Sequence, residues 1–151
     1  MAFFEELASH GSKLEILLLQ SYFEQAELSA QACLTNPSIH NIDEWYSWLR
    51  LVWSKVDCIM SPEERTHIGK WFNKYQEVFG ELVTRPSMRK RKVHSLVLMA
   101  ECVNHLNKIY VYIRRRTQAR GMHFRYWDKP SSLDDALEEL DRYDKRNKEN
   151  R

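Results

Sequence analysis

Residues 86–121, PSMRKRKVHSLVLMAECVNHLNKIYVYIRRRTQARG, carry the pattern that decides the predicted fold. Apolar residues repeat here at heptad spacing in two series offset by three: Leu96, Val103 and Tyr110, and Met99, Leu106 and Ile113. Such a heptad seam is typical of a helix that packs along other helices. Pro86 precedes the seam, and Gly121 suits the position just after a helix C-terminus. The pattern predicts a helix over Met88–Arg120, about 50 Å long at the usual rise.

Three more amphipathic helices are predicted before this one, at about Ser12–Leu34, Ile42–Met60 and Pro62–Thr84. The third has the clearest start, since Ser61-Pro62-Glu63-Glu64 combines a capping serine, an N1 proline and an N3 glutamate. At the second helix we expect Asn41 to be the cap, after a loop over residues 39–42. Short connections between such helices predict an all-α fold, an antiparallel four-helix bundle with a long fourth helix.

A fifth, short helix is predicted near the C-terminus, from Leu133 to about Tyr143. Ser132 can cap it, and its leucines, at 133, 137 and 140, are spaced for one helix face. Its other positions are rich in carboxylates: Asp134, Asp135, Glu138, Glu139 and Asp141. The chain is therefore predicted to consist of a helical bundle domain, residues 1–130, and an acidic C-terminal helix with a polar tail, residues 131–151.

The composition of the 151-residue chain fits one domain that folds without metal or disulfides. Only 4 Gly and 4 Pro are present, which favours long helices over the turn-rich β folds. The three cysteines, Cys33, Cys58 and Cys102, cannot all pair, and we expect buried free thiols in a reducing compartment. No signal peptide or membrane span is recognisable, so we expect a cytoplasmic protein that does not bind membranes.

Charge is distributed unevenly along the chain, although the formal net charge is only +2. Residues 1–75 have a balance of −4, residues 76–130 a balance of +8, and residues 131–151 a balance of −2. A basic segment between two acidic ones can either pair with its own acidic neighbours or face an anionic partner. The sequence alone leaves both alternatives open.

Two cationic blocks, one at each end of the predicted fourth helix, are the candidate functional site. Arginine dominates the second block, and its planar fork suits phosphate better than an ammonium group does. We therefore predict a non-enzymatic protein, without cofactors, that binds DNA or RNA through sequence-independent phosphate contacts. The predicted nucleic-acid-binding residues are Arg85, Arg89, Lys90, Arg91 and Lys92 in the first block, and Arg114, Arg115, Arg116, Arg120 and Arg125 in the second.

The main alternative is a protein-interaction or adaptor module, including a homodimer formed through the heptad seam. Three tryptophans within nine residues, Trp45, Trp48 and Trp53, offer a second surface for such a partner if they are not all in the core. Trp53 lies partly off the apolar stripe, so it is the one that we expect to be exposed.

Two further patterns bear on catalysis and metal binding. Arg89 and His94 resemble the Arg-x4-His motif of HEPN ribonucleases, which implies an arginine that holds phosphate and a histidine that transfers a proton. Lys90 departs from that family's usual residue. Glu64 and His67 form one Glu-x-x-His pair, whereas a di-iron bundle site requires two, so we predict no metal site. HEPN-like cleavage of RNA is kept as a second alternative.

Overall fold

The computed structural model describes residues 13–84, 92–124 and Arg142, and every regular element within them is a helix. The elements are α2 (Lys13–Thr35), α3 (Ile39–Val56), the 3-10 turn η1 (Asp57–Ile59), α4 (Pro62–Thr84) and α5 (Lys92–Ala119). The predicted all-α class is thus confirmed for the described residues, which contain four α-helices and no strand. The predicted acidic helix and tail lie, apart from Arg142, outside the described residues.

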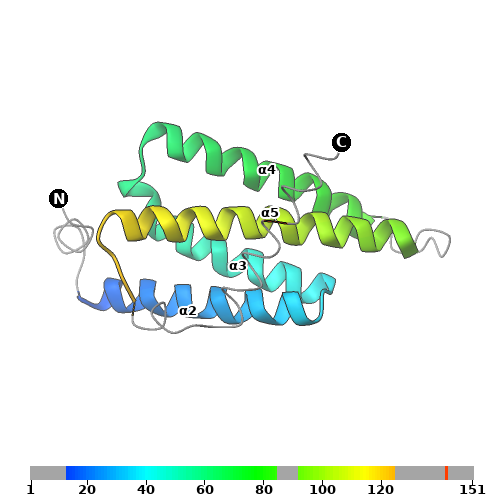
Figure 1. The fold of residues 1–151 in the computed structure, drawn as a ribbon, viewed down its shortest axis with the longest axis horizontal. Coiled ribbons are helices and arrows are strands. Elements are labelled where there is room, and N and C mark those ends of the chain that lie inside the picture. Colours follow the sequence, from blue (N-terminus) through cyan, green and yellow to red (C-terminus); the bar gives the residue numbers. More distant parts are fainter. Residues whose placement is uncertain (1–12, 85–91, 125–141, 143–151) are drawn as a thin grey trace.

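Helix α5 lies across the middle of the view in Figure 1, between α4 (green) and α2 (blue). Helix α3 packs against both α2 and α5, and α4 packs along α5. Most of the heptad seam of α5 therefore packs against other helices of the same chain. Its later members, Leu106, Tyr110 and Ile113, are fully buried, whereas its first member, Leu96, is 61% exposed.

The start of α3 differs from the prediction. Ser38 is the N-cap, and its hydroxyl accepts a hydrogen bond from the backbone N–H of Asn41 at 3.1 Å. The Asn41 side chain instead donates to the carbonyl of Asn36 at 2.8 Å. The expected loop over residues 39–42 is therefore wrong, because a serine directly after Pro37 caps the helix three residues earlier than Asn41 would.

The start of α4 is the predicted capping box. The backbone N–H of Glu64 donates to the Ser61 hydroxyl at 3.2 Å, and the N–H of Ser61 donates to the Glu64 carboxylate at 2.8 Å. Two backbone donors at the helix terminus are thereby satisfied. The arrangement also holds the Glu64 carboxylate at the beginning of α4.

The end of α5 is a glycine turn that sends the chain towards α2. Gly121 has a φ of 91°, a conformation that favours glycine. The N–H of Met122 donates to the carbonyl of Thr117 at 3.1 Å, and that of Gly121 donates to Gln118 at 3.0 Å, which together form a Schellman motif. Phe124 then packs on Phe23 of α2, with ring centroids 5.5 Å apart. Figure 1 shows this segment in gold, running from α5 to α2.

The tryptophans and cysteines differ in part from expectation. Trp45 is fully buried, with its ring edge-on to Tyr110, and Trp53 is half-buried against the core rather than exposed. Trp48 is also half-buried, so the three form no exposed aromatic platform. All three cysteines are free, but Cys58 is exposed while the other two are buried. Cys58 follows the end of α3 in η1, where the helix stripe no longer applies.

Candidate functional site

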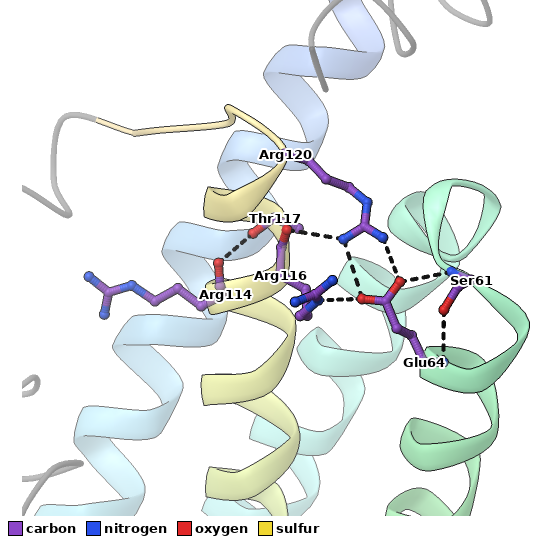
Figure 2. Close-up of polar contacts among 6 residues, drawn as sticks. All are labelled: Ser61, Glu64, Arg114, Arg116, Thr117 and Arg120. Carbon is purple, nitrogen blue, oxygen red and sulfur yellow. Dashed lines mark hydrogen bonds and ion pairs between the residues drawn. The ribbon is translucent and has the colours of Figure 1, made fainter. Parts of the chain in front are cut away.

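The basic C-terminal end of α5 is bound to the beginning of α4 by one buried carboxylate (Figure 2). Arg116 Nε donates to Glu64 Oε2. Arg120 Nη2 donates to Glu64 Oε1, and Arg120 Nη1 lies 3.3 Å from Oε2. Glu64 is only 6% exposed, so two guanidinium groups and the capping bond from Ser61 together satisfy a carboxylate that water scarcely reaches.

These contacts determine the ionisation of Glu64. Burial by itself would raise the pKa of this carboxyl group. The hydrogen bond from the Ser61 backbone and those from Arg120 and Arg116 outweigh burial, and they lower the pKa to about 2. Glu64 is therefore a carboxylate throughout the neutral range, and its charge is compensated within the molecule.

The neighbouring Arg114 points the other way, as Figure 2 shows, and contacts α2. Its Nη1 atom lies 3.5 Å from Glu27 Oε1, and Tyr110 donates to the same oxygen at 3.2 Å. Both charged side chains of this pair are largely buried. The pair joins α5 to α2 near the point where Phe124 packs on Phe23.

The structure therefore places most of the described second block in internal ion pairs. Arg114, Arg116 and Arg120 face carboxylates of α2 and α4, while Arg115 is exposed and Arg125 lies outside the described residues. Sequence reasoning missed Glu27 and Glu64 as their partners. Helix geometry contains part of the signal, because residues two apart, such as Arg114 and Arg116, point to opposite faces of a helix, and residues four apart share one.

The first basic block is described only at its last residue. Arg85, Arg89, Lys90 and Arg91 lie outside the described residues, and Lys92 is the first residue of α5. A helix of 28 residues is about 42 Å long. The structure thus keeps Lys92 and the second block apart at opposite ends of α5.

An apolar groove lies near the N-terminal end of α5, where the sequence predicted the start of the heptad seam but no pocket. It is a pocket of ≈ 240 Å³ between the C-terminal end of α2 and the N-terminal half of α5, and we call it the α2/α5 groove. Its lining residues are Cys33, Leu34, Pro37, Leu96, Met99, Ala100, Val103 and Asn104. None of them carries a formal charge, and Val97 beside Leu96 is also exposed. One signal for it was available in the sequence, because the heptad seam starts at Leu96, close to the beginning of the helix, where a neighbouring helix need not cover it.

The groove wall includes a thiol that stays protonated. Cys33 is fully buried with respect to solvent, and burial raises its pKa to about 11. Burial likewise raises the pKa of Cys102 to about 12. The pocket therefore offers a neutral, apolar surface and no activated nucleophile.

The candidate catalytic and metal-binding residues have other contacts. His94 Nε2 lies 3.5 Å from Glu81 Oε1 on an exposed surface. Arg89, its counterpart in the HEPN-like motif, lies outside the described residues, so that resemblance stays a prediction. His67 packs near Trp71, with ring centroids 6.2 Å apart, while Glu64 binds the two arginines. In the part of the chain that the structure describes, no three His, Cys, Asp or Glu side chains gather as metal ligands would.

A search with this chain against protein-family models, curated proteins and solved structures found no match. Over residues 13–84 and 92–124, no helix has the length and apolar character needed to cross a bilayer.

Proposed function

We propose that this protein is a non-enzymatic interaction module that binds an amphipathic helix of a protein partner in the α2/α5 groove. The observation that supports this most is an apolar pocket of ≈ 240 Å³ lined by Leu96, which is 61% exposed, with Val97 beside it 49% exposed. A homodimer through the heptad seam has less support, because Leu106, Tyr110 and Ile113 are buried inside the monomer.

The groove favours a helical partner for two reasons. Its walls are helices, whose backbone groups are already hydrogen-bonded along most of their length, so an extended strand would find few partners there. A helix brings its own backbone hydrogen bonds. The pocket is also smaller than the roughly 300–1,000 Å³ of a typical small-molecule site, which suits a few aliphatic side chains from a partner.

The test uses the full chain and a fluorescent 14-residue peptide with leucines at i, i+4 and i+7 and glutamates between them. We expect saturable binding by fluorescence anisotropy, weakened at least about tenfold by Leu96→Asp, which places a charge beside the pocket. The matched control is Leu17→Asp, because Leu17 is similarly exposed, at 60%, but lies near the other end of α2. Equal loss in both variants, or no binding at all, would argue against the groove as the docking site.

Binding to nucleic acid is the second candidate function. Arg115 is exposed between two arginines that are held internally, and residues 85–92 contain five cations and no acid. Phosphate contacts through these residues would weaken steeply with salt. An electrophoretic shift with DNA and with RNA at about 50 mM salt tests this. Arg115→Glu should weaken any complex, and it is a cleaner variant than charge reversal at Arg114 or Arg116, which would also break ion pairs in the fold.

We also propose the finer architecture and the compartment. The helices are taken to alternate in direction, because three residues between α2 and α3 suffice only for a reversal. The acidic segment from Leu133 to Tyr143 is taken to be a fifth helix. The three free thiols support a reducing compartment such as the cytoplasm.

A further inference from the structure

We propose that the chain's own C-terminal segment, Leu133–Tyr143, occupies the α2/α5 groove when no partner is bound. A partner helix would then have to displace it, so the segment regulates the site. The occupancy itself stands on the groove and the sequence, whereas its regulatory meaning rests on the proposed function.

The segment has the chemistry that the groove requires. Its leucines at 133, 137 and 140 follow the i, i+4, i+7 spacing of one helix face, which is how a helix enters an apolar groove. The groove offers the neutral side chains of Leu34, Leu96 and Met99 to such a face. Burial of leucine side chains there would remove from water the apolar surface that Leu96 exposes.

The path of the chain makes this occupant reachable. The continuous described chain ends at Phe124, which packs on Phe23 and so lies on the α2 side of the molecule (Figure 1), and beyond it the structure describes only Arg142. From Phe23 to Cys33 is ten residues of helix, about 15 Å. The nine peptide steps from Phe124 to Leu133 can span up to about 30 Å. The connection is therefore long enough to bring Leu133 to the groove without moving any described helix.

Charge favours the same occupant and its placement. Lys92, the first residue of α5, precedes the groove residue Leu96 by four positions in the sequence. In the sequence Lys92 follows Arg89, Lys90 and Arg91, and the positive end of the α5 dipole lies here too. Residues 29–38 contain no acidic residue, and the stretch of α5 that lines the groove, residues 96–104, contains one, Glu101. The five carboxylates of the segment would therefore be attracted towards the cations at the start of α5 and away from Glu101.

The proposal is tested in the full chain by NMR with ¹³C-methyl-labelled methionine. Met99 lines the groove, while Met60 and Met122 are buried elsewhere and act as internal references for the fold. We expect nuclear Overhauser contacts between the Met99 methyl group and leucine methyl groups of the segment. In the double variant Leu137→Asp/Leu140→Asp these contacts should disappear and the Met99 resonance should move, with Met60 and Met122 unchanged.

The matched control is Lys145→Asp/Lys148→Asp, which adds two aspartates to the same end of the chain and keeps the leucines. The control should leave the Met99 resonance in place. If the resonance is the same in the wild type and in both variants, and no contact to Met99 is seen, the segment does not occupy the groove.

The peptide titration separates this proposal from the proposed function. A tethered competitor has a millimolar effective concentration, so its removal in Leu137→Asp/Leu140→Asp should strengthen peptide binding about tenfold. A shifted Met99 resonance without peptide binding to either protein would uphold the occupancy and overturn the interaction module. Equal peptide binding to both proteins, with an unmoved Met99 resonance, would uphold the interaction module and overturn the occupancy of the groove by the segment.

Discussion

In each half of α5 the side chains are used differently from what the sequence suggests. The C-terminal half carries most of the arginines, yet three of them are fastened to carboxylates on the neighbouring helices. The N-terminal half continues the heptad seam, yet it leaves Leu96 exposed beside an open apolar groove. A cluster of charge is therefore no sign of a binding surface until its internal partners are known, and an apolar repeat is no sign of burial until its neighbours are.

The largest effect is expected from removing the carboxylate that joins α4 to α5. Glu64→Ala would leave Arg116 and Arg120 without their partner and remove half of the capping box. We expect a loss of about 3 kcal/mol in the free energy of unfolding, measured by urea denaturation. Glu63→Ala is the control, since Glu63 is exposed in the same turn. Equal losses in the two variants would show that neither the ion pairs nor the capping bond of Glu64 stabilises the fold.

The second effect concerns acid. The pKa of Glu64 is about 2 in the folded chain, below its ordinary value of 4.5, so ionisation of this group stabilises the fold. That contribution is complete above about pH 4.5 and is lost as the pH falls towards 2. Because Arg116 is partly exposed, we expect roughly 2 kcal/mol. The stability difference between the wild type and Glu64→Gln should shrink over this range, and a difference that does not depend on pH would contradict the assignment.

A smaller effect is expected at the ion pair that joins α5 to α2. The coupling between Glu27 and Arg114, from a double-mutant cycle of alanine substitutions in urea denaturation, should be about 1 kcal/mol in favour of folding. The same cycle with Glu24, which is exposed on α2, and Arg114 should give no coupling. If the two cycles agree, the Glu27–Arg114 pair adds nothing to the stability of the fold.

The smallest effect on stability is expected in the N-terminal half. Leu96→Ala should cost no more than about 1 kcal/mol in the free energy of unfolding, because the described helices leave the side chain largely exposed and only the docked C-terminal segment would cover it. The same change at the fully buried Leu106 should cost about 3 kcal/mol. Similar costs at both positions would contradict this prediction, because they would mean that Leu96 is packed as fully as Leu106.

Much of the fold could be predicted because its signals are local. The capping box at Ser61 and the glycine after α5 act within a few residues, and the structure has both as expected. The start of α3 was misplaced since Ser38 and Asn41 are both good caps only three residues apart. Local preference could not decide between them, and the earlier serine was available first after the proline.

The candidate site was harder to predict because its contacts are not local. Glu64 lies 52 residues before Arg116 and 56 before Arg120, and no spacing rule connects residues that far apart. The helix phase of the arginines shows which face each occupies, but not what that face meets. The groove was missed for a related reason, since it depends on where α2 ends relative to α5.

Glu64 also has a consequence for how the molecule opens. The same carboxylate completes the first turn of α4 and receives the last turns of α5, so the fraying of one helix end removes a partner from the other. The start of α4 and the end of α5 should therefore open together, as one cooperative unit. Their amide hydrogens should exchange with water at similar rates, although helix ends ordinarily exchange independently. At the opposite end of α5 the described charged contact is the one between His94 and Glu81 of α4, and it is exposed, so the start of α5 has no buried carboxylate of this kind among the described residues.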